Sequence, residues 1–163
     1  IHEYCHGITT RLTGGPSTTF CLMPEESREL GKEGWEDICS LFLTATESTG
    51  RTRTLGSFAN WSVFGIRPYP YSTDFAVNPS TYGWLNRESI GSHMLGSIFG
   101  SMLWDLYWAM IDHAEENGLM GFNSNKYESA IGGSNIAMQL IVEGLKIQPC
   151  QPTFVQSRDA ILV

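Results

Sequence analysis

The chain has 163 residues, of which 42% are hydrophobic, 12% aromatic and 17% charged, a composition that argues against wholesale disorder. Its length suits one domain that can bury a core of its own. The formal net charge of −7 argues against a nucleic-acid partner or an anionic membrane surface, and no run of about 18 apolar residues predicts a membrane span.

Two helices are predicted in the first third of the chain. Residues 1–11 have the pattern of a helix that lacks its N-terminal end, and the Gly-Gly-Pro that follows them is a typical stop signal. Residues 25–47 form a second helical pattern, in which Trp35, Ile38 and Leu41 recur at helical spacing. These apolar residues predict that one face of the second helix is buried.

The middle of the chain reads as a long loop, and the rest reads as helices. Residues 50–91 are rich in Gly, Ser, Pro and aromatic residues, which predicts a structured loop with at most a short strand or two. Residues 92–116 carry the clearest apolar stripe, 132–146 predict another helix, and 153–162 predict a short helix capped by Thr153. The sequence therefore predicts a mainly α fold.

The four cysteines are too few and too irregularly spaced to define a disulfide scaffold. Cys21 and Cys150 fall in loop-like stretches and could pair with each other if the protein is exported. Cys5 and Cys39 fall within helical patterns and are expected to be small core residues.

The first residues of the chain contain the pattern H-E-x-x-H. On a helix, His2 and His6 at positions i and i+4 lie one above the other, so both imidazoles can reach one metal ion. Glu3 points about 100° around the helix, where it can act on a metal-bound water without binding the metal. The pattern is short and also arises by chance on ordinary helices, so a zinc site needs a third ligand.

The second predicted helix offers that ligand. Glu33 and Asp37 are also spaced i and i+4, so one carboxylate could bind zinc while the other fixes the tautomer of a ligating histidine. Most acidic pairs of this kind form a solvated helix face instead, and Glu36 is expected to belong to such a face.

Together these segments resemble a known family. The stretch HEYCHGITTRLTGGP followed by EGWED resembles the fungalysins, secreted zinc metalloendopeptidases that read H-E-Y-x-H-G, then R-L-T-G-G, then E-G-W-S-D. The resemblance continues through GIRPYPYSTD, GSHMLGSIFGSMLWDLYWA and LKIQPCQPTFVQSRDAIL, so five blocks match in order over nearly the whole chain.

The resemblance implies a role for each residue of the motif. His2, His6 and Glu33 would be the ligands of a Zn²⁺ cofactor, and Glu3 would be the catalytic base and proton shuttle. Asp37 would bind the far nitrogen of a ligating histidine, His2 in the first place.

The similarity of the family fold to thermolysin implies three further roles. His93, at the head of the 92–116 helix, would donate a hydrogen bond to the oxyanion of the tetrahedral intermediate. Glu88 would orient His93, and Arg67 would reach a substrate carbonyl; an ordinary loop ion pair is the alternative for each of these two residues. No tyrosine precedes Glu33 closely enough to be assigned as an oxyanion donor.

Two departures from the family pattern are visible. Lys32 precedes the third ligand where small residues are usual, which would put a cation near the site. Glu36 replaces the usual serine, and this change is expected to be harmless because it falls on a solvated face.

The resemblance also implies an architecture. In thermolysin-like enzymes, zinc lies between an N-terminal lobe rich in β-structure and a helical C-terminal lobe. Residues 1–163 would be a partial peptidase domain, namely the helical C-terminal lobe truncated at its N-terminus. The N-terminal lobe, a signal segment and an inhibitory pro-segment would belong to the parent chain, which would be secreted and extracellular.

The predicted activity is hydrolysis of internal peptide bonds in protein or peptide substrates through a metal-activated water. The fragment alone is expected to be weakly active or inactive, because the edge strand that aligns a substrate belongs to the other lobe. Two alternatives remain: a zinc hydrolase of other amides or an aminopeptidase, and a non-catalytic metal-binding or interaction module derived from a peptidase.

Overall fold

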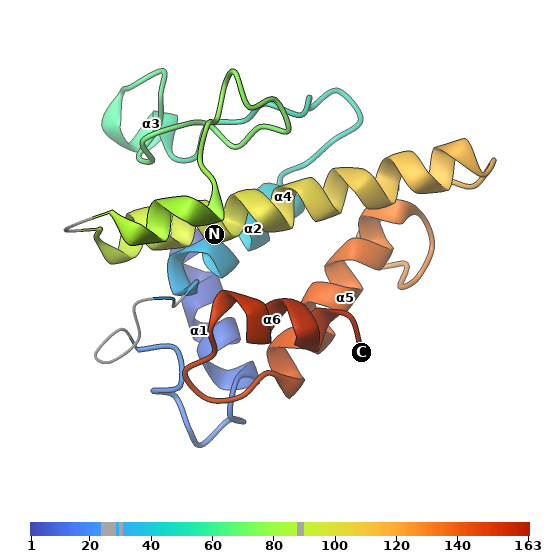
Figure 1. The fold of residues 1–163 in the computed structure, drawn as a ribbon. Coiled ribbons are helices and arrows are strands. Elements are labelled where there is room, and N and C mark those ends of the chain that lie inside the picture. The colour runs from blue at the N-terminus through green and yellow to red at the C-terminus, as the bar shows by residue number, and fades with distance from the viewer. Residues whose placement is uncertain (24–28, 30, 88–89) are drawn as a thin grey trace.

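Helices make up the regular structure of the chain in the computed structural model, which describes residues 1–23, 29, 31–87 and 90–163. Within these residues no strand forms, and the only extended pairing is an isolated antiparallel bridge between Arg53 and Tyr71. The mainly α fold class is therefore confirmed. The elements, shown in Figure 1, are α1 (His2–Leu12), α2 (Lys32–Leu43), α3 (Ser57–Asn60), the 3₁₀ helix η1 (Tyr82–Asn86), α4 (Ser92–Glu116), α5 (Gly133–Ile147) and α6 (Phe154–Ile161).

The long helix α4 is the centre of the arrangement. It packs against α2 and α5, while α1 packs against α2 and α6 against α5. The loop that carries α3 lies on one side of α4, and α1, α5 and α6 lie on the other (Figure 1). This order places the N-terminal helix α1, with the H-E-x-x-H pattern, directly against α2, which carries Glu33 and Asp37.

The core forms from the apolar faces that the helical spacing predicts. On α2, Trp35, Ile38 and Leu41 are at most 2% exposed, and on α4 the stripe from Leu95 to Ile111 is largely buried. Each fully buried large apolar side chain contributes roughly 1.5–3 kcal/mol. These contacts fix α2 against α4, and with it the carboxylates that α2 carries.

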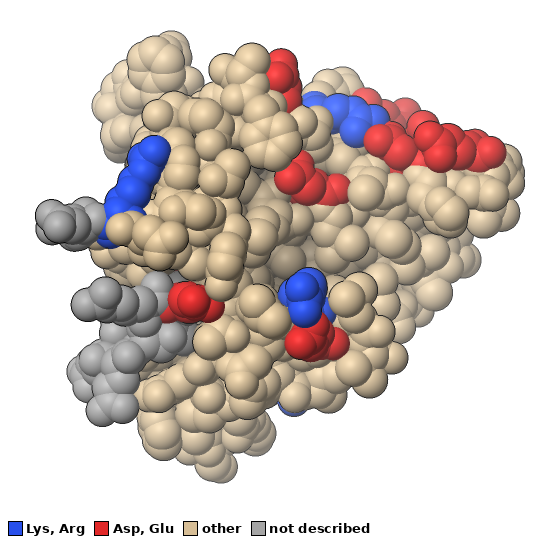
Figure 2. Space-filling view, viewed as in Figure 1, with Lys and Arg blue, Asp and Glu red and all other residues tan. Residues whose placement is uncertain are grey.

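By length and composition alone, α4 could cross a membrane. In the fold, however, 61% of the most apolar 18-residue stretch of α4 is buried. The core helix of a soluble protein has the same combination of length, composition and burial. Acidic side chains gather over its C-terminal end (Figure 2), where the sequence carries Asp112, Glu115 and Glu116. This end lies about 35 Å along the helix from His93, beyond the range of a screened charge.

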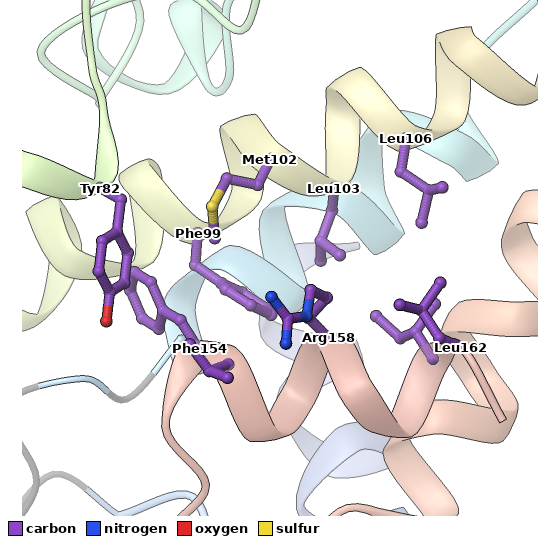
Figure 3. A pocket seen from close by; sticks show the side chains of 10 residues that line it. Tyr82, Phe99, Met102, Leu103, Leu106, Phe154, Arg158 and Leu162 are labelled. Atoms are coloured by element: carbon purple, nitrogen blue, oxygen red, sulfur yellow. The ribbon is translucent and has the colours of Figure 1, made fainter.

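An apolar hollow of about 440 Å³ separates α4 from α6 (Figure 3). Met102 and Leu106, which belong to the predicted stripe of α4, face this hollow instead of a tightly packed neighbour, and Met102 is 36% exposed. On the side of α6 it is lined by Phe154 and Leu162. None of the residues assigned above to the metal site borders it.

Most predicted helix bounds agree with the structure within one or two residues. The helix predicted at 92–116 coincides with α4, and Thr153 caps α6 by accepting a hydrogen bond from the backbone N–H of Gln156. The helix predicted at 25–47 is shorter in the structure, where α2 begins only at Lys32 and ends at Leu43. Residues 24–28 and 30, which belong to the predicted start, lie outside the described residues.

The cysteines form two disulfides, Cys21–Cys150 and Cys5–Cys39. The first is the pair that the sequence suggested. Cys5 is fully buried, as expected of a small core residue, but its bond to Cys39 was not predicted; packing of α1 on α2 brings the two sulfur atoms together. This second bridge ties the two helices that carry the predicted metal ligands.

Gly34 on α2 and Gly96 on α4 allow the two helices to approach each other closely. A Cβ at Gly34 would lie 2.3 Å from the carbonyl oxygen of Gly96 and 2.7 Å from the backbone nitrogen of Gly100. Both obstacles are backbone atoms, so neither can rotate away and the two helices would have to separate. We expect Gly34→Ala to cost about 1–3 kcal/mol of stability, as overpacked core substitutions do.

The measurement is the thermal unfolding midpoint of the complete gene product that carries these residues. Gly50→Ala is the matched control, because a Cβ at Gly50 meets no atom within 4 Å. Equal midpoints for the two variants would contradict a close contact between α2 and α4.

Candidate metal centre

Three side chains from α1 and α2 converge on one point. The Nε2 atom of His2 lies 3.3 Å from Oε2 of Glu33, and Nε2 of His6 lies 3.8 Å from Oε1 of the same carboxylate. One donor atom from each of the three residues lies within 4.8 Å of the other two. The imidazole rings stand nearly perpendicular, at 86°, with their centroids 4.7 Å apart.

This donor set fits a zinc ion. Two donor atoms bound to a tetrahedral zinc at 2.0–2.1 Å are about 3.3 Å apart, close to the separations between Glu33 and the two imidazoles. Two histidines and a carboxylate with an open position are also the ligand types of a catalytic zinc site. The three side chains are 13–22% exposed, so a small molecule can reach them from solvent.

Asp37 lies beneath this cluster and is fully buried. Its Oδ1 atom is 2.8 Å from Nδ1 of His2, while Arg67 donates two hydrogen bonds to the carboxylate, at 2.6 and 2.8 Å, and the hydroxyl of Tyr71 donates a third. Burial alone would raise the pKa of Asp37, but the hydrogen bonds from His2, Arg67 and Tyr71 together lower it below its ordinary value. Asp37 is therefore a carboxylate anion in contact with the far nitrogen of His2.

The position of Glu36 was predicted wrongly from the sequence. It was expected on a solvated face, but it is 0% exposed, because the face of α2 that carries Glu33, Glu36 and Asp37 is covered by α1. Its Oε1 atom lies 3.2 Å from Nδ1 of His6 and accepts a hydrogen bond from the hydroxyl of Thr9. The contact with Glu36 raises the pKa of His6, burial opposes this shift, and the charges of Glu36 and Glu33 add to it.

Arg67 is buried against the same carboxylates. Besides its two hydrogen bonds to Asp37, its Nη2 atom lies 3.3 Å from Oε2 of Glu33. The guanidinium therefore links the residue predicted to bind zinc with the residue that contacts His2. Its predicted contact with a substrate carbonyl stays a prediction.

The other predicted site residues lie around the cluster. His93, in the first turn of α4, is 71% exposed in its side chain, and its Nε2 atom lies 3.6 Å from Oε2 of Glu33. Glu3 is exposed on α1 and lines an open hollow along that helix. Glu88, predicted to orient His93, lies outside the described residues.

The side chain of Lys32, the residue before Glu33, points away from the cluster, although its charge opposes the rise in the pKa of His6. Its Nζ atom lies 3.7 Å from the sulfur of Met23, because adjacent helix positions point about 100° apart. On the other helix, the disulfide from Cys5 to Cys39 occupies the position next to His6 and leaves Cys5 without a thiol that could bind metal.

Sequence reasoning missed two contributors to the site. Glu36 could have been found, because its i+3 spacing from Glu33 puts it on the same face as the predicted ligand. Tyr71 had no local signal, since it contacts Asp37 from a loop 34 residues further along the chain. Burial raises the pKa of Tyr71 well above its ordinary value, so its hydroxyl stays protonated and acts as a donor.

Comparison with known proteins places this chain in a family. Residues 1–163 match the family model described as fungalysin metallopeptidase (M36). Extracellular metalloproteinase 10 of Coccidioides posadasii is 40% identical over 165 residues, which cover 99% of this chain and 26% of that protein. An extracellular metalloproteinase of Pyrenophora tritici-repentis is also 40% identical, and one of Aspergillus fumigatus is 39% identical, each over 99% of this chain and 25% of its own length.

The chain thus spans about a quarter of the length of the curated relatives that it matches. The match is nonetheless complete on the side of this chain, and it includes every residue of the cluster described above. The chain belongs to the fungalysin metallopeptidase (M36) family, a family whose name implies a metal cofactor.

Proposed function

We propose that these residues form the helical C-terminal half of the active site of a zinc-dependent endopeptidase. The observation that carries the proposal is the convergence of His2, His6 and Glu33, whose donor separations suit one tetrahedral ion. Zinc, when bound there, would polarise a carbonyl and lower the pKa of water so that a nucleophile exists at neutral pH.

The proton transfers fall to Glu3. It follows the ligand His2 directly and is solvent-exposed, so its carboxylate is free to accept a proton from the attacking water. The same group would then hand that proton to the nitrogen of the departing amine. One carboxylate would thus act first as a general base and then as a general acid.

Charge that develops on the scissile carbonyl oxygen would be met by His93. Its exposed imidazole stands at the edge of the cluster, 3.6 Å from Glu33, where a donor can reach a substrate bound at the site. Asp37 would hold Nδ1 of His2 and so keep the Nε2 atom of that ring directed toward Glu33. Arg67 would fix the Asp37 and Glu33 carboxylates in place and offer its remaining donors to a substrate carbonyl.

The exposed side of α1 supports the idea that a second lobe completes the site. Tyr4 and Ile8 are 76% and 40% exposed on the helix that carries Glu3, and Ile1, directly before that helix, is 61% exposed. Apolar side chains so close to a site indicate a surface that another part of the protein covers. We assign that covering to an N-terminal lobe of the parent chain, which would also supply the edge strand for a peptide substrate.

Secretion is also part of the proposal. The relatives are named extracellular metalloproteinases, and all four cysteines of this chain are in disulfides, which persist in oxidising compartments. An inhibitory pro-segment in the parent chain would keep such an enzyme inactive until it leaves the cell.

The test is zinc content together with cleavage of casein by the complete gene product. We expect stoichiometric zinc and cleavage at internal peptide bonds, with loss of activity after treatment with a chelator and recovery when zinc is returned. Zinc binding without cleavage would favour a non-catalytic module derived from a peptidase, and cleavage that survives removal of all metal would contradict the zinc mechanism.

A further inference from the structure

We propose that Glu36 is a positioning residue for His6, and that each of the two histidine ligands therefore has a carboxylate of its own. The inference rests on the proposed zinc site and concerns a residue that the family pattern E-G-W-S-D does not contain. Glu36 would supply a second carboxylate behind the ligands, in addition to Asp37.

The placement follows from helix geometry. Glu33, Glu36 and Asp37 are spaced i, i+3 and i+4 on α2, so all three side chains leave the same face of the helix. That face packs on α1, where His2 and His6 are themselves one turn apart. Two adjacent carboxylates of α2 are therefore placed opposite two successive imidazoles of α1.

The distances match this pairing. Oδ1 of Asp37 lies 2.8 Å from Nδ1 of His2, and Oε1 of Glu36 lies 3.2 Å from Nδ1 of His6. Both Nδ1 atoms are buried and make no aligned hydrogen bond with any described residue, so these carboxylate oxygens at 2.8 and 3.2 Å are the acceptors that face them. The Nε2 atoms of the same two rings are turned toward Glu33.

The pairing selects the tautomer that can bind a metal. Of the two neutral tautomers of the imidazole, a carboxylate beside Nδ1 favours the one with its proton on Nδ1, which leaves the lone pair of Nε2 free. Without Glu36, a larger fraction of His6 would carry its proton on Nε2. In that tautomer, Nε2 has no lone pair to donate to a metal. Glu36 would therefore raise zinc affinity through His6 without touching the ion.

The surroundings of Glu36 argue against a merely structural role. Its side chain is fully buried, and its Oε2 atom has no hydrogen-bond partner among the described residues. A neutral side chain would fill this space at a lower desolvation cost. The hydroxyl of Thr9 donates to Oε1, the same oxygen that faces His6, and so fixes that oxygen toward the imidazole.

The charge balance points the same way. Glu33, Glu36, Asp37 and Arg67 are largely or fully buried and together carry a net charge of −2 when ionised. One divalent cation would neutralise this group of charges. The negative charge of these buried carboxylates is therefore best balanced when the cation is bound.

The first measurement is the dissociation constant of zinc for the complete gene product, obtained by competition with a chelating dye. Glu36→Gln keeps the shape of the side chain but removes its charge, and we expect zinc binding to weaken by about 10- to 100-fold, as for other groups that support a metal ligand. Glu116→Gln is the matched control, because it removes the same charge from an exposed position on α4. It is expected to leave the constant unchanged.

The second measurement detects the proton on Nδ1 of His6 in protein loaded with Co²⁺, where the Nδ1 protons of ligating histidines give resolved shifted resonances. Two such signals are expected from His2 and His6, and Glu36→Gln should move the His6 signal and speed its exchange with water. A side chain that only fills space would not change one histidine signal and leave the other in place.

The outcomes separate the two levels of the proposal. If Glu33→Ala leaves zinc binding intact, the zinc site is wrong and the role of Glu36 falls with it. If Glu33→Ala abolishes binding while Glu36→Gln changes neither the zinc constant nor the His6 signal, only the positioning role is overturned.

If Glu36→Gln does not fold, Thr9→Val provides the test, since it keeps the carboxylate but removes the hydrogen bond that fixes it. We expect zinc binding to weaken by about two- to tenfold, less than for loss of the carboxylate itself. An unchanged constant would overturn the proposal.

Discussion

Replacing Glu3 with glutamine is expected to abolish most peptide hydrolysis by the complete gene product while leaving its zinc content unchanged. Glutamine keeps the size of the side chain but cannot accept the proton of the attacking water, and loss of a general base costs about 10²- to 10⁴-fold in rate. Zinc should remain, because the three converging side chains are His2, His6 and Glu33, and Glu3 is not among them. The measurement is the rate of casein cleavage, together with zinc content by atomic absorption.

Glu143→Gln is the control for this experiment, since Glu143 is exposed on α5, where it pairs with Lys146. It should retain full activity. A Glu3→Gln enzyme with more than a tenth of the normal rate would remove Glu3 from the mechanism. Loss of zinc together with activity would instead make Glu3 part of the metal site.

The second large effect is expected for Glu33→Ala, which should abolish zinc binding. Glu33 is the residue on which His2, His6, His93 and Arg67 all converge, and it provides the only donor from α2 to the three-residue cluster. We expect zinc affinity to fall by more than about 100-fold, beyond the range found for residues that only support a ligand. Equilibrium dialysis with zinc measures this directly.

Lys32→Ala is a matched control, because it changes the residue next to Glu33 but removes a side chain that points to Met23. Its zinc affinity should be normal. Equal zinc binding by Glu33→Ala and Lys32→Ala would contradict the ligand set, and reduced binding by both would indicate that the start of α2 is disturbed by either change.

Helix periodicity predicted the fold well, but it failed where burial depends on distant contacts. The apolar stripes of α2 and α4 follow from local spacing, and these residues are buried as expected. The long loop gave no such signal, yet Tyr71 from this loop is fully buried and donates to Asp37. The hydrophobic effect favours burial of an apolar face, but it is not directional and does not determine which loop packs over the polar residues beside that face.

The same limit explains the error at Glu36. Acidic side chains on helices are mostly solvated, so the sequence alone favoured an exposed position. Burial of Glu36 required α1 to pack on that face of α2, with an imidazole and a hydroxyl in reach of the carboxylate. The pairing of Cys5 with Cys39 depends on the same packing, which no local pattern encodes.

By itself, the sequence determined which side chains share a helix face: His2 with His6, and Glu33 with Asp37, since both pairs are spaced by one helical turn. Only the tertiary structure decided that these two faces meet, that Arg67 and Tyr71 close around Asp37, and that Glu36 lies behind His6. The physical reason is that spacing along a helix is a local property of the backbone, whereas the contact between α1 and α2 depends on side chains that are distant in sequence and pack into one core.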